Sequence, residues 1–222
     1  MRSKRIGLLL GIMLIGWVFV AGKADAALLN FDIFLPDILS DSVGVYNYDA
    51  GTDLFTSTAV PLTITFTGLP GSLIPITGTY PSTLSYSVGF HVDALGNFSG
   101  GITGDDLVIK GAFTYDSILY SGTLLSGEVT NFGWLDTGSG ALFDYTFDFT
   151  GGALSSFYAG YGNRGGDKMY AEIAPTFTGV FTADHSGTKV KHDTAPVPEP
   201  SSLLLLGGGL LSAALLRVRR KK

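Results

Sequence analysis

The sequence predicts an all-β fold: a single antiparallel β-sandwich or jelly-roll-like domain over residues 27–183. The clearest observation is the alternation of apolar and polar residues. In residues 84–93 every even position is apolar and every odd position is polar or Gly, and residues 143–149 and 62–67 alternate in the same way. A period of two is typical of a strand with one buried face and one face in water.

Turn signals are the second observation. Residues 29–35, 43–48, 107–115, 119–130 and 169–182 are further, less regular strand candidates. Clusters rich in Gly, Pro, Asn and Asp separate the runs, at residues 49–53, 69–71, 94–97, 100–101 and 151–152. Eight or more short strands with such turns favour a sandwich or jelly roll over a helical fold.

The N-terminal segment, residues 1–26, has the order of a secretory signal peptide. Arg2, Lys4 and Arg5 precede an apolar run, and Ala24 and Ala26 provide the small residues that a signal peptidase recognises. We expect cleavage after Ala26. A retained N-terminal anchor is the alternative.

The C-terminal segment, residues 197–222, has a matching order. Pro198, Glu199 and Pro200 precede an expected transmembrane helix at residues 201–216, and a basic stop follows that consists of Arg217, Arg219, Arg220, Lys221 and Lys222. The apolar part would form a helix of only about 21 Å, shorter than the roughly 30 Å hydrocarbon core. It is therefore expected to be a provisional anchor. Positive charge outside both apolar segments predicts that both ends of the chain stay in the cytoplasm. The middle of the chain is then translocated to the other side of the membrane.

This C-terminal order resembles the PEP-CTERM sorting signal of Gram-negative bacteria. The resemblance rests on Pro198-Glu199-Pro200, the short apolar helix, the basic tail and the N-terminal export signal. It implies processing by an exosortase and by signal peptidase, transient residence in the inner membrane, and delivery to the cell surface or outside the cell, where such proteins are associated with exopolysaccharide or biofilm matrix. It covers the tail and implies nothing about the middle.

Between the two parts, residues 184–196 are polar and without periodicity, and they are expected to be a flexible tether. Residues 27–196 contain five Lys and Arg against 17 Asp and Glu, a net charge of −12. Such a domain is repelled by nucleic acid and by anionic lipid. The chain has no Cys, which excludes disulfides and a thiol nucleophile.

Catalytic patterns are weak. Residues 160–165 match G-x-G-x-x-G but lack the preceding strand and following helix, so a surface turn is expected. His91 lies on the polar side of its strand, and His185 and His192 lie in the expected tether, so all three are expected in solvent, not on zinc. Asp144 and Asp148 could pair as in a glycosidase, although outward carboxylates more often serve solubility.

The types of two sets of side chains suggest two binding hypotheses, one for a metal ion and one for a sugar. Asp49, Asp53, Asp105 and Asp106 are loop carboxylates that could hold Ca²⁺, without an EF-hand pattern. Trp134 could stack on a sugar if it is exposed, but a buried Trp at a strand end is the commoner case.

The sequence therefore predicts an exported cell-surface or extracellular matrix protein with a structural or adhesive role, no catalytic activity and no required cofactor. A secreted carbohydrate-binding module is the first alternative. A divergent secreted hydrolase is the second.

Overall fold

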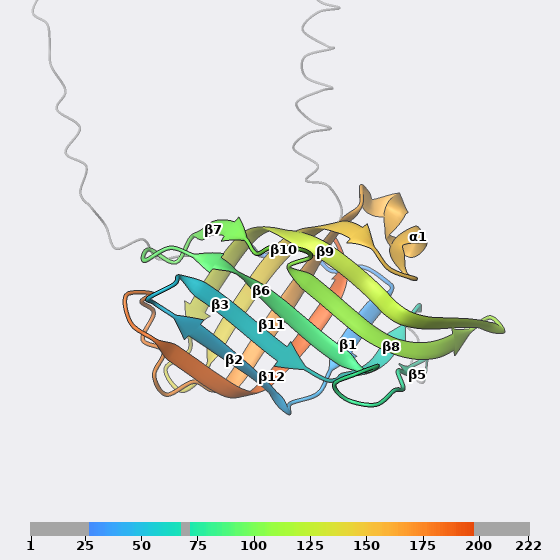
Figure 1. Cartoon of the computed structure of the whole chain (residues 1–222), viewed down its shortest axis with the longest axis horizontal. Coiled ribbons are helices and arrows are strands. Elements are labelled where there is room, and N and C mark those ends of the chain that lie inside the picture. The colour runs from blue at the N-terminus through green and yellow to red at the C-terminus, as the bar shows by residue number, and fades with distance from the viewer. Residues whose placement is uncertain (1–26, 68–71, 198–222) are drawn as a thin grey trace, which may run out of the picture.

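The computed structural model describes residues 27–67 and 72–197, and this part of the chain is almost entirely antiparallel β-structure (Figure 1). The strands are β1 (Asp37–Ser40), β2 (Gly44–Asp49), β3 (Leu54–Ala59), β4 (Pro61–Thr65), β5 (Ile74–Pro75), β6 (Ser85–Val92), β7 (Phe98–Gly101), β8 (Leu107–Tyr115), β9 (Ile118–Asp136), β10 (Ala141–Gly151), β11 (Arg164–Ile173) and β12 (His185–Pro196). A four-residue helix, α1 (Ser155–Tyr158), and a 3-10 turn, Ala159–Tyr161, connect β10 to β11.

The sheet closes on itself. Its hydrogen-bonded order runs β11-β10-β9-β8-β6-β3-β2-β12, and β12 also pairs with β11, so that eight strands form an antiparallel barrel. Strand β1 pairs with β12 at Asp193 and Thr194, beyond the residues that pair with β2, and β4 and β5 continue the sheet from β1. The all-β antiparallel prediction is confirmed, but the sandwich or jelly roll is wrong, because one sheet is joined edge to edge.

The closing strand lies where the sequence predicted a tether. Residues 185–196 form β12, which pairs with β11 from Gly165↔Pro196 to Ile173↔Thr188 and with β2 from Tyr48↔His185 to Gly44↔Val190. The tether prediction is therefore wrong. Its physical reason is that the inward residues of this strand include polar side chains that are hydrogen-bonded inside the barrel, so the strand shows no apolar alternation.

The clearly alternating segments are confirmed as β6, β10 and β4. Strand β3 was missed, because Thr56, Ser57 and Thr58 hide its alternation. Residues 29–35 are not a strand; this segment is held outside the barrel by hydrogen bonds such as Phe34 N–H to Pro196 O, 3.1 Å.

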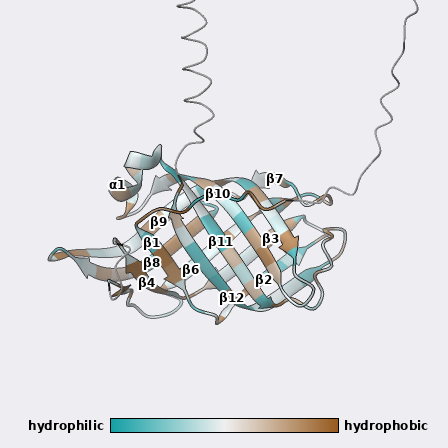
Figure 2. Ribbon diagram, turned by 180° about the vertical axis from the view of Figure 1, so that it is seen from behind, coloured by the Kyte–Doolittle hydropathy of each residue, from teal (hydrophilic) through white to brown (hydrophobic). Residues whose placement is uncertain are grey.

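Aromatic side chains fill the interior. The largest fully buried ones come from strands around the barrel, from α1 and from the connection between β11 and β12: Tyr46, Tyr48, Tyr86, Tyr145, Tyr158, Phe55, Phe90, Phe143, Phe147 and Phe181. Phe55 is the centre of one cluster, with ring centroids 5.2 Å from Phe90 and 5.2 Å from Phe143. Apolar and polar segments alternate along the strands in Figure 2, as expected for a small barrel whose interior is filled by side chains.

The expected signal peptide, the Pro198–Pro200 triplet and the expected transmembrane helix lie outside the described residues. Within residues 27–67 and 72–197, no helix is long and apolar enough to cross a membrane.

Candidate functional site

Trp134 is a core residue of β9. Only 8% of its surface is exposed, and its ring lies 5.6 Å from Phe177 and 5.5 Å from Phe181 between centroids. The stacking of a sugar on an exposed Trp134 is therefore ruled out in this structure, and the buried interpretation is correct.

Two of the three histidines are buried, which corrects the expectation of solvated side chains. His185 and His192 face the barrel interior from β12, whereas His91 on β6 is partly exposed, with Nδ1 3.1 Å from Thr52 O. His185 packs among Tyr48, Phe177 and Phe181. Burial lowers the pKa of His185 to about 4, because its imidazolium form would lose hydration there.

Asp144 and Asp148 have separate roles on the outer side of β10. Asp144 is buried beneath the N-terminal segment and accepts the backbone N–H groups of Leu29, 3.0 Å, and Asn30, 3.2 Å. Asp148 is exposed and lies 3.6 Å from Arg164 Nε. The two carboxylates are thus committed to different partners and do not form a glycosidase pair.

The four loop aspartates do not converge in one site. Asp49 accepts the N–H of Gly51, 2.8 Å, while Asp106 is buried and accepts those of Ile102, 2.6 Å, and Val129, 2.8 Å. Asp53 lies near Tyr48 Oη, 3.3 Å, and Asp105 accepts the Thr150 hydroxyl. In the part of the chain that the structure describes, no three His, Cys, Asp or Glu side chains are placed to hold a metal. Calcium binding stays a prediction.

Residues 160–165 form the end of the 3-10 turn and the start of β11, with Gly162 in the left-handed region at φ 74°. The expected turn is confirmed, since no helix follows the glycines as nucleotide binding would require.

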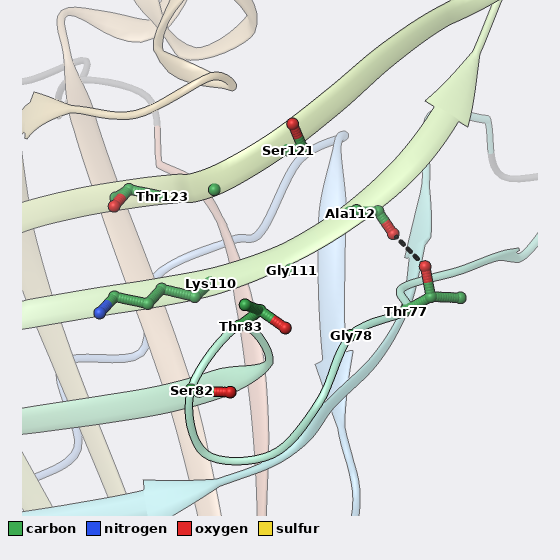
Figure 3. Close-up of a pocket in the computed structure, with 10 residues that line it drawn as sticks. Thr77, Gly78, Ser82, Thr83, Lys110, Gly111, Ala112, Ser121 and Thr123 are labelled. Atoms are coloured by element: carbon green, nitrogen blue, oxygen red, sulfur yellow. Dashed lines mark hydrogen bonds between the residues drawn. The ribbon is translucent and has the colours of Figure 1, made fainter.

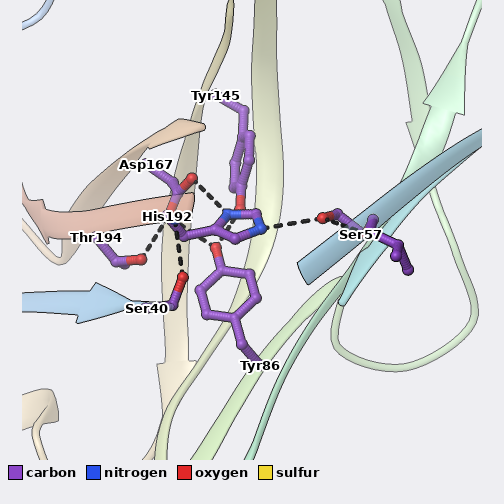
Figure 4. Close-up of polar contacts among 8 residues, drawn as sticks. Ser40, Ser57, Tyr86, Tyr145, Asp167, His192 and Thr194 are labelled. Atoms are coloured by element: carbon purple, nitrogen blue, oxygen red, sulfur yellow. Dashed lines mark hydrogen bonds and ion pairs between the residues drawn. The ribbon is translucent and has the colours of Figure 1, made fainter. Parts of the chain in front are cut away.

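A buried polar chain crosses the barrel interior (Figure 4). Asp167 Oδ1 on β11 lies 2.9 Å from His192 Nδ1 on β12, and His192 Nε2 lies 3.0 Å from Ser57 Oγ on β3. The exposed fractions of the three residues are 0%, 1% and 2%. Sequence analysis missed this hydrogen-bonded series of side chains, because Asp167 and His192 come from segments without a recognisable motif.

Further side chains complete this group, which we call the interior polar cluster: Ser40, Ser57, Tyr86, Tyr145, Asp167, His192 and Thr194. Tyr86 and Thr194 donate to Asp167 Oδ2, 2.8 and 2.5 Å, and Tyr145 is hydrogen-bonded to Tyr86. The Ser40 hydroxyl accepts the backbone N–H of His192, 2.8 Å. Burial raises the pKa of Tyr86 and Tyr145 well above the usual range, so both phenols stay protonated.

The order Asp, His, Ser is that of a hydrolase triad. The Ser57 hydroxyl has two protein neighbours, Val45 O at 3.0 Å and His192 Nε2 at 3.0 Å, and it is buried. A serine nucleophile must reach a bound substrate, whereas this hydroxyl is enclosed by protein groups. The Tyr86 ring also covers His192 at a centroid distance of 4.0 Å. We interpret the cluster as a structural connection between β1, β3, β6, β10, β11 and β12.

A carboxyl pair lies at the junction of β1 and β12. Burial is the largest cause that raises the pKa of Asp37 to about 8. The side-chain hydrogen bond with Asp193 and the negative charge of Asp193 raise it further. Asp37 is therefore protonated over most of the physiological range.

A groove of about 440 Å³ lies outside the barrel (Figure 3). One side is the loop at residues 77–83, and the other side is the adjoining outer faces of β8 and β9. The loop is fixed by Thr77, whose N–H donates to Ala112 O, 2.8 Å, while the Ala112 N–H donates to Thr77 O, 2.9 Å. Lys110 is paired across the strands with Thr123, and Ala112 with Ser121. These four side chains thus form a regular patch facing the loop.

Comparison with known proteins identifies the C-terminal part of the chain only. Residues 196–221 match the family model described as the PEP-CTERM protein-sorting motif. Neither the curated proteins nor the solved structures contain a significant match. The matched residues begin at Pro196, the last residue of β12, so that the barrel and the motif are contiguous. The chain carries a PEP-CTERM sorting motif, which marks it as an exported, extracellular or cell-surface protein that an exosortase processes.

Proposed function

We propose that the protein is a structural or adhesive component of the cell surface or extracellular matrix, associated with exopolysaccharide and without catalytic activity of its own. The observation that carries this proposal is the sorting motif at residues 196–221, which directly follows a closed barrel. In this proposal the barrel is the part that is delivered to the cell surface, and the terminal segments are the sorting signals.

The position of the motif supports delivery of an intact barrel. Val197 is still part of the packed structure: it is buried, and its N–H donates to Arg164 O, 3.1 Å. Processing at Pro198-Glu199-Pro200 would therefore remove no strand of the barrel.

The interior polar cluster supports a role without catalysis. Its imidazole and carboxylate are in contact with other protein groups and are closed off from solvent. A general base must reach a proton of a bound substrate, and these groups reach only each other.

The test is Glu199→Ala in the producing cell, followed by cell fractionation and by the intact mass of the protein. We expect a longer product that stays in the inner membrane. Glu128→Ala on β9 is the matched control, since it makes the same chemical change within the barrel and should leave processing unchanged. Normal release of the Glu199→Ala protein at the mass of the processed form would contradict the proposal.

A carbohydrate-binding module is the second candidate function. The sequence placed its site at Trp134, which is buried. The outer groove favours the same class of function at a different place.

A further inference from the structure

We propose that the outer groove binds a segment of acidic polysaccharide, with the Lys110 ammonium group pairing with a carboxylate or sulfate of the sugar. This inference deepens the proposed function, because it gives the association with exopolysaccharide a site and a ligand charge. The residues that carry it are Lys110, Ser121 and Thr123 on the barrel and Thr83 on the loop.

The first argument concerns positive charge. The five basic residues of the described domain are placed very differently. Arg164 pairs with Asp148, and Lys189 and Lys191 both pair with Glu172. Lys168 lies over the Phe31 ring, 5.4 Å from its centroid. Lys110 alone among these five has no ion-pair or aromatic partner within the described residues.

An unpaired cation is unusual on this surface. Residues 27–196 carry a net charge of −12, so acidic partners for a lysine are plentiful. No Asp or Glu lines the groove among the described residues, however. An anionic ligand could therefore meet Lys110 without repulsion from a carboxylate in the groove wall.

The second argument concerns hydrogen-bonding capacity. The hydroxyls of Ser121 and Thr123 have no intramolecular partner within residues 27–67 and 72–197. On the loop, Thr83 Oγ1 accepts the N–H of Thr79, 2.8 Å, and keeps its own proton available to a ligand. Each of these hydroxyls can both donate and accept. A sugar presents the same combination of groups.

The shape of the groove agrees with a chain-like ligand. It is an open depression of about 440 Å³ between a loop and a sheet, in the range of small-ligand sites. Gly122 lies in the left-handed region at φ +88°, and a Cβ built there would meet no atom within 4 Å. The strand therefore leaves open space beside the patch, through which a polymer could continue.

Acidic polysaccharide fits better than the other polyanions. The groove contains no aromatic side chain on which a base could stack. A single lysine among hydroxyls suits a ligand that presents both carboxylate and hydroxyl groups.

The test is a binding titration of the full-length chain, purified in detergent, with a hexamer of a uronic acid and with a neutral glucose hexamer. We expect saturable binding of the uronate hexamer with millimolar or better affinity and at least fivefold weaker binding of the neutral hexamer. Lys110→Gln should weaken uronate binding about fivefold. Lys189→Gln makes the same charge change outside the groove and should leave uronate binding unchanged, so it controls for the change in net charge.

Two results would overturn the inference: equal weakening by Lys110→Gln and Lys189→Gln, or equal binding of the charged and the neutral hexamer. Thr123→Val offers an independent check, since it removes a groove hydroxyl without changing the charge and should weaken binding by a further measurable factor. The titration does not require processing, so its failure is distinguishable from a failure of the Glu199→Ala experiment.

Discussion

The interior polar cluster and the outer groove are both polar regions of one barrel, yet they differ in whether their hydrogen-bonding groups have partners within the protein. Inside, Asp167 contacts His192, Tyr86 and Thr194. Outside, Lys110, Ser121 and Thr123 have no intramolecular partner among the described residues. Reactive residue types therefore do not indicate function by themselves. What matters is whether their capacity is used by the protein or left for a ligand.

The strongest test of this comparison is Asp167→Ala. It would leave His192, Thr194 and Tyr86 without their common partner in the interior, and an unpaired buried group costs about 1–3 kcal/mol. We therefore expect the free energy of unfolding to fall by at least about 3 kcal/mol. Urea unfolding of the purified protein measures it, and Asp148→Ala on the barrel exterior is the control. A loss below about 1 kcal/mol would show that the cluster does not hold the barrel together.

The second test uses the pH dependence of His185. The pKa of this residue is lowered to about 4 in the folded state, from 6.5. The unfolded chain therefore binds the proton more readily, and stability is lost as pH falls from about 6.5 to about 4. We expect His185→Phe to remove about 2 kcal/mol of this acid destabilisation. Unfolding curves at pH 7.5 and pH 4.5 measure it; an unchanged slope for the variant would contradict the burial of a neutral imidazole.

The third test uses the opposite dependence of Asp37. Its pKa is raised to about 8 in the folded state. A buried carboxyl of this kind favours the protonated form, so its contribution to stability is full below about pH 4 and is lost as pH rises to about 8. We expect Asp37→Asn to stabilise the protein at pH 8 by about 1 kcal/mol, after allowance for solvent screening, and to have little effect at pH 4. Equal effects at both pH values would refute the shared proton.

The smallest expected effect is on the groove side. Lys110→Gln should change the free energy of unfolding by less than about 0.5 kcal/mol, because the replaced ammonium has no partner to lose. The same variant is expected to lose uronate affinity. A large loss of stability instead would mean that Lys110 belongs to the fold and not to a binding site.

The sequence predicted the strands with one apolar face well. Residues 84–93 and 143–149 alternate cleanly, and they are β6 and β10. Closure could not be predicted in the same way, because it depends on β12. The inward positions of that strand include His185, His192 and Thr194, whose burial is compensated by packing or by partners from distant strands.

The candidate site shows the same limit. The groove brings the loop at residues 77–83 next to β8 and β9, and no local motif joins these segments. The signal that could have indicated it is the isolated Lys110 in an acidic domain. The sorting motif was predictable for the opposite reason, because all of its parts are consecutive in the chain.

The place of β12 in the chain has a consequence for the timing of folding. Thr188 of this strand pairs with Val45 of β2, and Asp193 pairs with Leu39 of β1. These contacts join the last segment made before the sorting motif to the first segments of the domain, and such long loops close slowly. The barrel therefore cannot close before β12 is present, and nearly the whole domain must be available before its first strands find their partners.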